Sequence, residues 1–213
     1  MIIDERMSAF IDSLDSGNPA WLNEIEKFAL ETQVPIIRRS MQSLLKFLLK
    51  FTKPKSILEV GTAIGFSALL MSEYMPQDGH ITTIEKYEKR IPLAKENFSK
   101  NQKTSCITLL EGDAIEILGE LTDTYDFIFM DAAKGQYINF LPDILRLLNK
   151  GGILLSDNIL QDGDIIESRY AVVRRNRTIH TRMREYLYAL KNHEQLQTVI
   201  LPLGDGVTIS VRK

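Results

Sequence analysis

The sequence predicts an α/β fold with a seven-stranded, mostly parallel sheet that ends in an antiparallel hairpin. From residue 56 onward, short apolar runs alternate with stretches whose apolar residues recur at the helical period. Near the C-terminus, two strand-like runs are separated only by a short glycine-containing turn, which is typical of a hairpin. With 213 residues, 44% of them hydrophobic and 25% charged, the chain is an ordinary globular sequence, and we expect one domain.

The first 51 residues are expected to be helical. Apolar residues recur at helical spacing from Ile3 to Leu14, and Asn18-Pro19 is a typical helix start. Residues 33–36 interrupt the pattern, and a third helix is predicted from Ile37 onward. These helices could form a cap over the ligand crevice, a packing layer or a dimer contact. We therefore divide the domain into a helical N-terminal cap, 1–51, and a core, 56–213.

The core is predicted from its apolar runs. The five parallel strands are expected at 56–60, 80–85, 105–110, 125–130 and 151–156, and the hairpin strands at 195–201 and 207–212. A helical stretch separates each pair of parallel strands. Pro142 lies inside one of these stretches, and a proline in a helix interior removes a hydrogen bond. We therefore predict that Pro142 lies in the first turn of its helix.

Composition limits the possible classes of protein. The net charge of −2 does not indicate a nucleic-acid binder, so any such role would depend on a local patch. The single cysteine, Cys106, excludes an intramolecular disulfide. No apolar run is long enough to span a membrane, and the N-terminus lacks a signal-peptide pattern. We expect a cytoplasmic protein that does not associate with membranes.

The turn after the first predicted strand suggests a ligand. A strand, a turn with Gly61 and Gly65 and a helix together build a binding crevice in open parallel sheets. The dinucleotide pattern G-x-G-x-x-G is absent, because Ala63 and Phe66 occupy the required glycine positions, and this disfavours a nicotinamide oxidoreductase. The negative charge of Glu59 favours a cationic ligand. S-adenosylmethionine, with its sulfonium and ammonium groups, is such a ligand, although an ordinary strand–helix turn remains the alternative.

Acidic residues mark the ends of four predicted strands: Glu59, Glu85, Asp113 and Asp131. Ligands of open α/β sheets bind beyond the carboxyl ends of the strands. Glu85 lies where a carboxylate would meet ribose hydroxyls, and Asp113 with Ala114 would border an adenine. Each acid alone could equally cap a helix or end a loop, but four in succession favour a binding site.

A second group of residues offers only oxygen ligands. Asp131, Asp157 and Asn158 follow two neighbouring predicted strands, and such donors suit Mg²⁺, Mn²⁺ or Ca²⁺. The alternative, that residues 157–158 merely begin a turn, remains open from the spacing alone. Lys134 follows Asp131 closely, and a nearby cation would lower the pKa of its amino group. Lys134 is therefore a candidate general base toward a hydroxyl, unless it is an ordinary surface lysine.

Three stretches together, 59–67, 131–134 and 157–158, resemble the cation-dependent class I O-methyltransferases, the family of catechol and caffeoyl-CoA methyltransferases. The resemblance extends from about Val34 to the C-terminus and implies a Rossmann-like fold and a homodimer. It implies a cofactor site for S-adenosylmethionine at Ile37, Glu59, Gly61, Ser67, Glu85, Asp113, Ala114 and Asp131. It also implies a Mg²⁺ site at Asp131, Asp157 and Asn158, with Asp131 and Lys134 as the catalytic residues.

Residues 34–36, 132–137 and 204–206 resemble more closely the bacterial enzymes that methylate 5-hydroxyuridine in tRNA. This resemblance implies formation of 5-methoxyuridine at the wobble position. The 5-hydroxyl group and the neighbouring C4 carbonyl oxygen of that base could chelate a metal as a catechol does.

Arginines near the last long helix would suit the phosphates of a tRNA anticodon loop. The candidates are Arg174, Arg175, Arg177 and Arg182, and Arg38 with Arg39 could add to them. The alternative is a solvated basic face. In that case the substrate could be a small catechol-like compound or an acyl-CoA. A protein of another class, a non-catalytic RNA-binding protein, would not bind S-adenosylmethionine.

Overall fold

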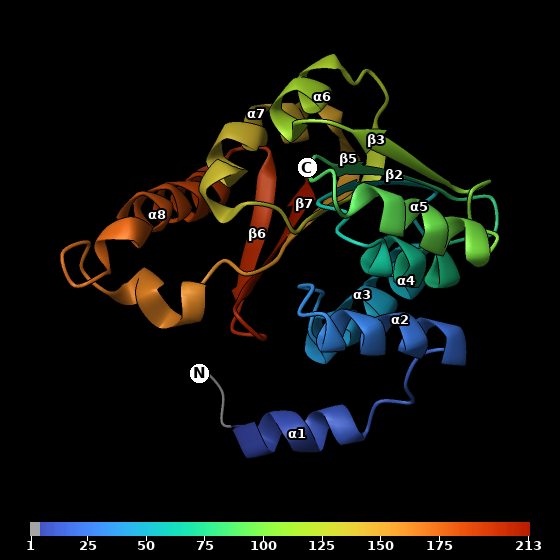
Figure 1. Cartoon of the computed structure of the whole chain (residues 1–213). Helices are drawn as coiled ribbons and strands as arrows, with labels where there is room; N and C mark the ends of the chain where they lie inside the picture. Colours follow the sequence, from blue (N-terminus) through green and yellow to red (C-terminus); the bar gives the residue numbers. More distant parts are fainter. Residues whose placement is uncertain (1–4) are drawn as a thin grey trace.

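The computed structural model describes residues 5–213 and confirms the predicted fold class. Ile3, which begins the predicted apolar stripe, lies outside this range. Three helices precede the sheet: α1 (Glu5–Ser13), α2 (Ala20–Glu31) and α3 (Arg39–Thr52). Helices α2 and α3 pack against α4 (Phe66–Tyr74) and form an outer layer on one face of the sheet (Figure 1). The connection between α2 and α3, rather than the helices themselves, reaches the crevice.

The sheet has seven strands in the order β3-β2-β1-β4-β5-β7-β6. Their bounds are β1 Ser56–Val60, β2 His80–Glu85, β3 Ile107–Glu111, β4 Tyr125–Met130, β5 Leu148–Ser156, β6 Leu196–Leu201 and β7 Val207–Arg212. The first five strands are parallel, and β7 pairs antiparallel with both β5 and β6, as predicted. The strand order reverses between β1 and β4, the place where open sheets bind ligands.

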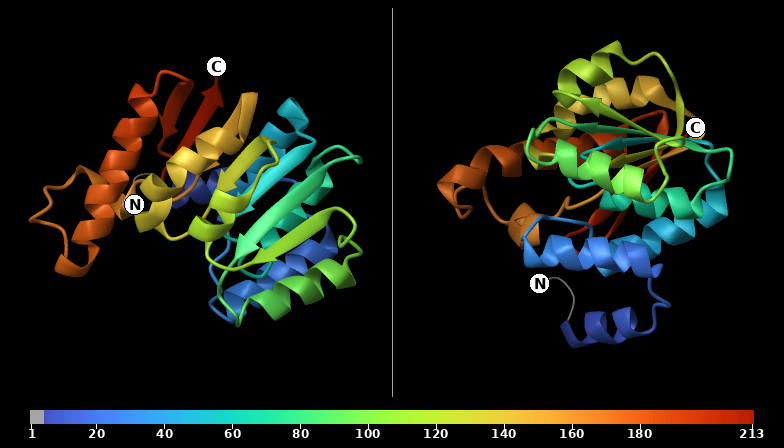
Figure 2. Two further views of the ribbon diagram at one scale, coloured as in Figure 1. Left: turned by 90° about the horizontal axis from the view of Figure 1, so that it is seen from above. Right: turned by 45° about the vertical axis from the view of Figure 1, so that its right-hand side comes forward.

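Helices cover both faces of the sheet. The remaining helices are α5 (Ile91–Lys100), α6 (Ala114–Glu120), α7 (Tyr137–Leu147) and α8 (Arg177–Asn192), with short 3₁₀ helices η1 (Lys134–Gln136), η2 (Gln161–Ile166) and η3 (Arg174–Asn176). Helices α4 and α5 lie on one face, while α6 and α7 lie on the other (Figure 1 and the right view of Figure 2). None of the helices between residues 5 and 213 is both long and apolar enough to cross a membrane.

Side chains of the central strands alternate between two cores. In β1, Ile57 belongs to the core under α4 and Leu58 to the core under α7. Burial on both faces explains why these strands are nearly continuous apolar runs. Because alternate side chains point to the same face, Glu59 is directed into the α4 side of the sheet.

Three strands have bounds that differ from those predicted, and the largest differences are at the starts of β5 and β3. Strand β5 begins at Leu148 rather than at residue 151, because Leu148 already pairs with Tyr125 of β4 across a shift in register. Strand β3 begins at Ile107 rather than at residue 105. Cys106 lies in the preceding turn, where its backbone N–H donates to the carbonyl of Lys103.

The prediction for Pro142 was wrong. Helix α7 begins at Tyr137, so Pro142 lies in its interior and not in its first turn. The start of the helix is held by Tyr137, whose buried hydroxyl donates to the carbonyl oxygens of Met130 and Asp157. Burial of Phe140 and Ile144 on the same helix adds to this anchoring, which outweighs the missing hydrogen bond at the proline.

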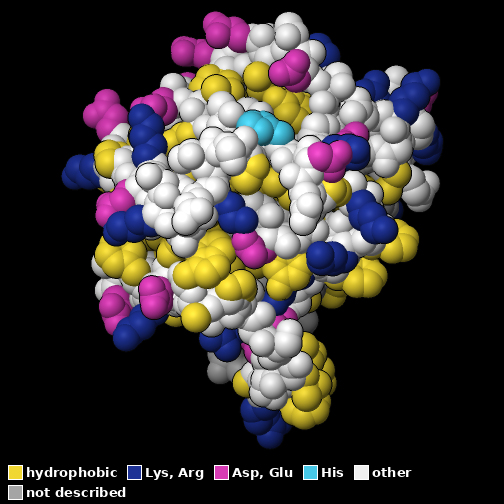
Figure 3. Space-filling model, turned by 90° about the vertical axis from the view of Figure 1, so that its right-hand side faces the viewer, with side chains coloured by type: hydrophobic (Ala, Val, Ile, Leu, Met, Phe, Trp, Pro, Cys, Tyr) yellow, Lys and Arg dark blue, Asp and Glu magenta, His cyan; other side chains and the backbone are white. Residues whose placement is uncertain are grey.

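Helix α1 projects from the rest of the protein (Figure 1). Three exposed apolar residues lie on this helix, Met7, Phe10 and Ile11, and a fourth, Leu14, follows it directly. The projecting lobe shows apolar side chains along one side (Figure 3). Just after α1, Asp15 pairs with Lys46 on α3 at 2.8 Å and accepts a hydrogen bond from Ser43.

Candidate active site

The turn after β1 requires its glycines. Gly61 has a φ of +108°, and a Cβ there would lie 2.2 Å from the carbonyl oxygen of Asp131. Gly65 has a φ of +85°, and its Cβ would meet the ring of Phe98. The turn is also held from β2, because the N–H of Ala63 donates to Glu85 Oε2 at 2.8 Å. Gly61 therefore lets the backbone at the end of β1 pack closely against the backbone at the end of β4.

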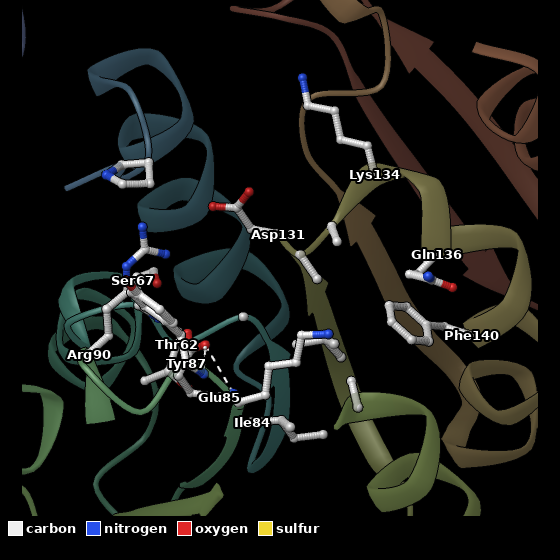
Figure 4. Close-up of a pocket in the computed structure, with 18 of the residues that line it drawn as sticks. Thr62, Ser67, Ile84, Glu85, Tyr87, Arg90, Asp131, Lys134, Gln136 and Phe140 are labelled. Atoms are coloured by element: carbon white, nitrogen blue, oxygen red, sulfur yellow. Dashed lines mark hydrogen bonds between the residues drawn. The ribbon is translucent and has the colours of Figure 1, made fainter. Parts of the chain in front are cut away.

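A cavity of about 480 Å³ opens at the carboxyl ends of β1, β2 and β4. It is lined by seven of the eight predicted cofactor residues: Ile37, Gly61, Ser67, Glu85, Asp113, Ala114 and Asp131. In Figure 4, Asp131 points toward the middle of this space from one side, and Glu85 and Ser67 line the opposite side. The structure thus brings these residues together from five segments that are distant in the sequence.

Asp113 has two roles that the sequence offered as alternatives. It caps helix α6, because its Oδ1 accepts a hydrogen bond from the N–H of Ile115 at 2.9 Å. It also lines the cavity. The hydrogen bond from Ile115 and the ion pair with Lys86 lower the pKa of the Asp113 carboxyl. Asp113 therefore remains an acceptor for hydrogen bonds from a ligand.

Glu59 does not line this cavity, contrary to what its place at the turn suggested. Its side chain is completely buried behind the wall, where Oε2 accepts a hydrogen bond from Thr83. Burial raises the pKa of Glu59 to about 7, so the carboxyl is not the freely ionised group we expected. Its Oε1 has no hydrogen-bond partner, and Ser67, which does line the cavity, is close enough to stabilise the charged form. Ser67 therefore lies between the buried carboxyl and the cavity.

The three predicted metal ligands lie together. Asn158 Nδ2 donates to Asp131 Oδ1 at 3.1 Å, and the N–H of Asn158 donates to Asp157 Oδ1 at 2.7 Å. Burial raises the pKa of both carboxyls. That of Asp157 rises to about 7, in part because of the charge on Asp131. Two buried carboxylates disfavour each other's ionised form, and a divalent cation would relieve this repulsion.

The donor set fits a hard cation, with two carboxylates and one amide oxygen. Between residues 5 and 213, no three His, Cys, Asp or Glu side chains are arranged to hold a metal. The third donor of the predicted site is the side-chain amide oxygen of Asn158, which does not belong to those four residue types. The φ of +59° at Asn158 is one that asparagine adopts more readily than most residues.

Lys134 is paired with a residue that the sequence analysis did not select. Its Nζ donates to Asp205 Oδ2 at 2.8 Å, and Asp205 is only 4% exposed. The other carboxylate oxygen of Asp205 accepts the backbone N–H of Asp162. Asp205 belongs to the turn between β6 and β7, and the pattern Gly204-Asp205-Gly206 carried no sign that this turn reaches the strand ends.

The hairpin turn is held against the segment that follows β5. The N–H groups of Ile159 and Leu160 donate to the carbonyls of Gly206 and Asp205 at 3.1 and 2.8 Å. A Cβ at Gly206 would lie 2.1 Å from Leu160. This close packing places Asp205 beside Lys134 and Asp157.

A second cavity of about 210 Å³ adjoins the first. The two share Pro35, Ile36, Ile37, Asp131 and Asn158. The second is completed by Arg38, Ser40, Met41, Asp157, Leu203, Gly204 and Asp205. A molecule in the second cavity would therefore lie beside the carboxylates and directly next to the larger cavity.

The four predicted RNA-binding arginines do not form one free patch. Arg174 and Arg175 are exposed on η3. Arg177 instead donates to the carbonyl oxygens of Tyr170 and Val172, and Arg182 donates to the carbonyl oxygen of Gly135 in η1. Arg182 thus supports the segment that carries Lys134.

Several cavity residues were not predicted. Lys86 and Tyr87 line the larger cavity, and their position directly after Glu85 at the end of β2 was a signal that could have identified them. Phe140 also lines it, but only the docking of α7 places its ring there.

The doubly wound sheet, the cavity at its switch point and the adjoining oxygen donors define a Rossmann-like protein that binds a small molecule at the carboxyl ends of its strands. A family model described as O-methyltransferase matches residues 12–213. The chain therefore belongs to this O-methyltransferase family.

Its relatives are consistent with this family. Caffeoyl-CoA O-methyltransferase 2 of Populus trichocarpa is 31% identical over 179 residues, which cover 79% of this chain and 71% of that protein. A catechol O-methyltransferase of Niastella koreensis is 32% identical over 127 residues, 58% of each chain.

Solved structures extend the similarity over almost the whole chain. A proposed caffeoyl-CoA O-methyltransferase from Staphylococcus aureus is 31% identical with a TM-score of 0.90, covering 99% of this chain and all of that one. A methyltransferase of Podospora anserina, bound to S-adenosylhomocysteine (SAH), is 29% identical with a TM-score of 0.88, covering 98% and 94% of the two chains.

Proposed function

We propose that this protein transfers a methyl group from S-adenosylmethionine to an aromatic hydroxyl. One observation carries the proposal: a ligand-sized cavity at the sheet's switch point meets a cluster of buried oxygen donors at Asp131. The SAH-bound state of the Podospora anserina relative supports the choice of cofactor.

The residues of the larger cavity suit the parts of this cofactor. Glu85, Asp113 and Ala114 line this cavity, where Glu85 would accept hydrogen bonds from the ribose hydroxyls and Asp113 with Ala114 would border the adenine. Gly61 lines the same cavity, where its backbone would face the ligand. Glu59 lies behind Ser67, so its carboxylate would act on the ammonium group through the wall of the cavity, and the ammonium charge would stabilise the ionised carboxylate.

We further propose that Asp131, Asp157 and Asn158 hold Mg²⁺, with Mn²⁺ or Ca²⁺ as alternatives. A cation bound there would supply Lewis acidity toward the acceptor hydroxyl. Lys134 would take the hydroxyl proton at Nζ, and Asp205 would stabilise the charged lysine that results. The acceptor oxygen then bonds to the methyl carbon as the carbon–sulfur bond breaks. Holding the reactants in line could lower the barrier by about 7 kcal/mol or more at best.

For the substrate we propose 5-hydroxyuridine at the wobble position of a tRNA anticodon loop. The exposed Arg174 and Arg175 suit RNA phosphates, and the sequence resemblance at 34–36, 132–137 and 204–206 adds support. The relatives favour a second candidate, a small catechol-like or acyl-CoA substrate.

The two candidates make different predictions. If tRNA is the substrate, tRNA from cells lacking this protein should lose 5-methoxyuridine and accumulate 5-hydroxyuridine in nucleoside mass spectrometry. Replacing both Arg174 and Arg175 by Ala should then slow methylation of tRNA but not of free catechol. An unchanged amount of 5-methoxyuridine in tRNA from those cells would exclude the tRNA substrate. Separately, full methyltransferase activity in excess chelator would exclude a role for the metal.

A further inference from the structure

The second cavity has an unusual distribution of charge. Its inner end contains the carboxyls of Asp131, Asp157 and Asp205, and one cationic side chain, Arg38, is among the described residues that line it. Lys134 is paired with Asp205 at this inner end. If a divalent cation is bound at Asp131 and Asp157, it offsets two of the three carboxylates, and the protonated form of Lys134, paired with Asp205, offsets the third. The charge of Arg38 then gives the cavity a net positive charge.

Arg38 is held only weakly. Its Nη2 lies 3.9 Å from Asp162 Oδ1, and the two side chains are 57% and 82% exposed. Exposed pairs of this kind contribute about 0–1 kcal/mol, so an anionic ligand could replace Asp162 at little cost. The guanidinium also has the planar geometry that pairs with phosphate or carboxylate through two hydrogen bonds.

The neighbouring arginine provides a natural comparison. Arg39 lines a different cavity, between α2 and α3, and its Nε lies 3.8 Å from Glu26. Glu26 is mostly buried, which distinguishes this pair from the exposed pair of Arg38 and Asp162. The two adjacent residues thus have similar charge and exposure but face different cavities.

The size of the second cavity limits its ligand. Drug-sized ligands occupy pockets of about 300–1,000 Å³, whereas this cavity measures about 210 Å³. It can take one aromatic ring with its hydroxyl at the inner end, and any larger part of the substrate must lie outside, past Arg38.

We propose that the second cavity selects a single hydroxy-aromatic ring that carries an anionic group on its outer side, and that Arg38 recognises this group. The proposal rests on the proposed function, because it assumes that the acceptor binds here. The anion can be the phosphate of a nucleotide or the carboxylate of a phenolic acid.

The test is calorimetric binding to the protein saturated with SAH and Mg²⁺. Two pairs of ligands differ by one anionic group: catechol with 3,4-dihydroxybenzoate, and 5-hydroxyuridine with its 5′-monophosphate. We expect the anionic member of at least one pair to bind about tenfold more tightly. Preference in the first pair alone would identify a carboxylate as the anion, and preference in the second alone would identify a phosphate.

Variants show which arginine causes the preference for the anionic ligand. Arg38→Ala should remove most of it, Arg38→Lys should retain part, and Arg39→Ala should keep it in full. The proposal is overturned if no ring binds, if neither pair shows a preference, or if Arg38→Ala and Arg39→Ala behave alike. Thermal unfolding of each variant shows whether it is folded.

Methyl transfer measured on the same variants and ligands, with S-adenosylmethionine in place of SAH, separates this inference from the proposed function. Binding with an Arg38-dependent preference but no methyl transfer to any ring would refute the function and leave the selectivity standing. Methyl transfer without the preference would refute only the selectivity.

Discussion

Two acidic side chains show how the surroundings of a residue decide its chemistry. Glu59 and Asp205 both carry a carboxyl in the buried part of the site. Glu59 has an unpaired oxygen and a raised pKa, whereas Asp205 is paired with Lys134 and with the N–H of Asp162. Glu59 suits a cationic group that belongs to a bound ligand. Asp205 instead positions the amino group of Lys134, which belongs to the protein.

Glu59 should make the ligand-free protein less stable as the pH rises. Its pKa is raised from an ordinary 4.5 to about 7, so the stabilisation is fully present below pH 4.5 and is lost as the pH rises through 7. We expect Glu59→Gln to remove this loss, which is on the order of 3 kcal/mol at pH 8. Urea unfolding at pH 5.5 and pH 8 measures about 2 kcal/mol of this loss, because part of it has already occurred at pH 5.5. Equal pH dependence in the two proteins would contradict the assignment.

The same substitution should weaken cofactor binding. The glutamine side chain would lack the negative charge that we expect opposite the ammonium group, so calorimetry should show at least tenfold weaker binding of SAH. Binding as tight as that of the unsubstituted protein would place the ammonium group elsewhere.

Asp205→Asn tests the pairing with Lys134. The amide keeps an oxygen for the N–H of Asp162 but removes the charge opposite Lys134 Nζ. We expect kcat to fall by about tenfold or more, up to the roughly 100-fold or greater effect of a general acid–base group itself, while SAH affinity stays unchanged. Asp205→Glu, which restores the charge, should recover part of kcat. An unchanged kcat in Asp205→Asn would remove Asp205 from the mechanism.

At the scale of elements, the hairpin turn and helix α7 show tertiary contacts overriding local preference. Helix α7 continues through Pro142 because Tyr137 is held at its start. From its sequence, the turn between β6 and β7 is an ordinary hairpin connection. In the structure it packs against the segment after β5, and this contact places Asp205 at the site.

Gly206→Ala should separate the turn from that segment. The new Cβ would collide with Leu160, and the φ of +83° is strained for alanine, so we expect a loss of about 2–4 kcal/mol in stability. Gly204→Ala is the matched control. Its φ is +58°, but its nearest contact would be an ordinary 3.6 Å, so about 1 kcal/mol is expected. Equal losses in urea unfolding would contradict the close packing at Gly206.

At the scale of the whole molecule, the sheet brings the site together and leaves α1 outside. Residues of the two cavities come from segments spread between positions 35 and 205, all meeting at the carboxyl ends of the strands or beside them. Helix α1 takes no part in either cavity and has exposed apolar side chains. We propose that a second copy of the chain covers this surface and forms the expected homodimer.

The double variant Phe10→Ser with Leu14→Ser tests this proposal. Both side chains are more than 60% exposed in the single chain, so their loss should not unfold it. We expect sedimentation velocity to show a dimer for the unsubstituted protein and a larger monomer fraction for the variant. A monomeric unsubstituted protein would refute the dimer, and a fully dimeric variant would place the contact elsewhere.

The sequence by itself determined the order and type of the core elements, the glycine turn at Gly61 and the line of acids at the strand ends. These follow from local periodicity and from the rule that parallel strands present their carboxyl ends at one edge. Only the tertiary structure decided that Glu59 is buried, that Asp205 pairs with Lys134 and that Arg38 and Arg39 face different cavities. Those outcomes depend on packing between residues far apart in the chain, which no local pattern encodes.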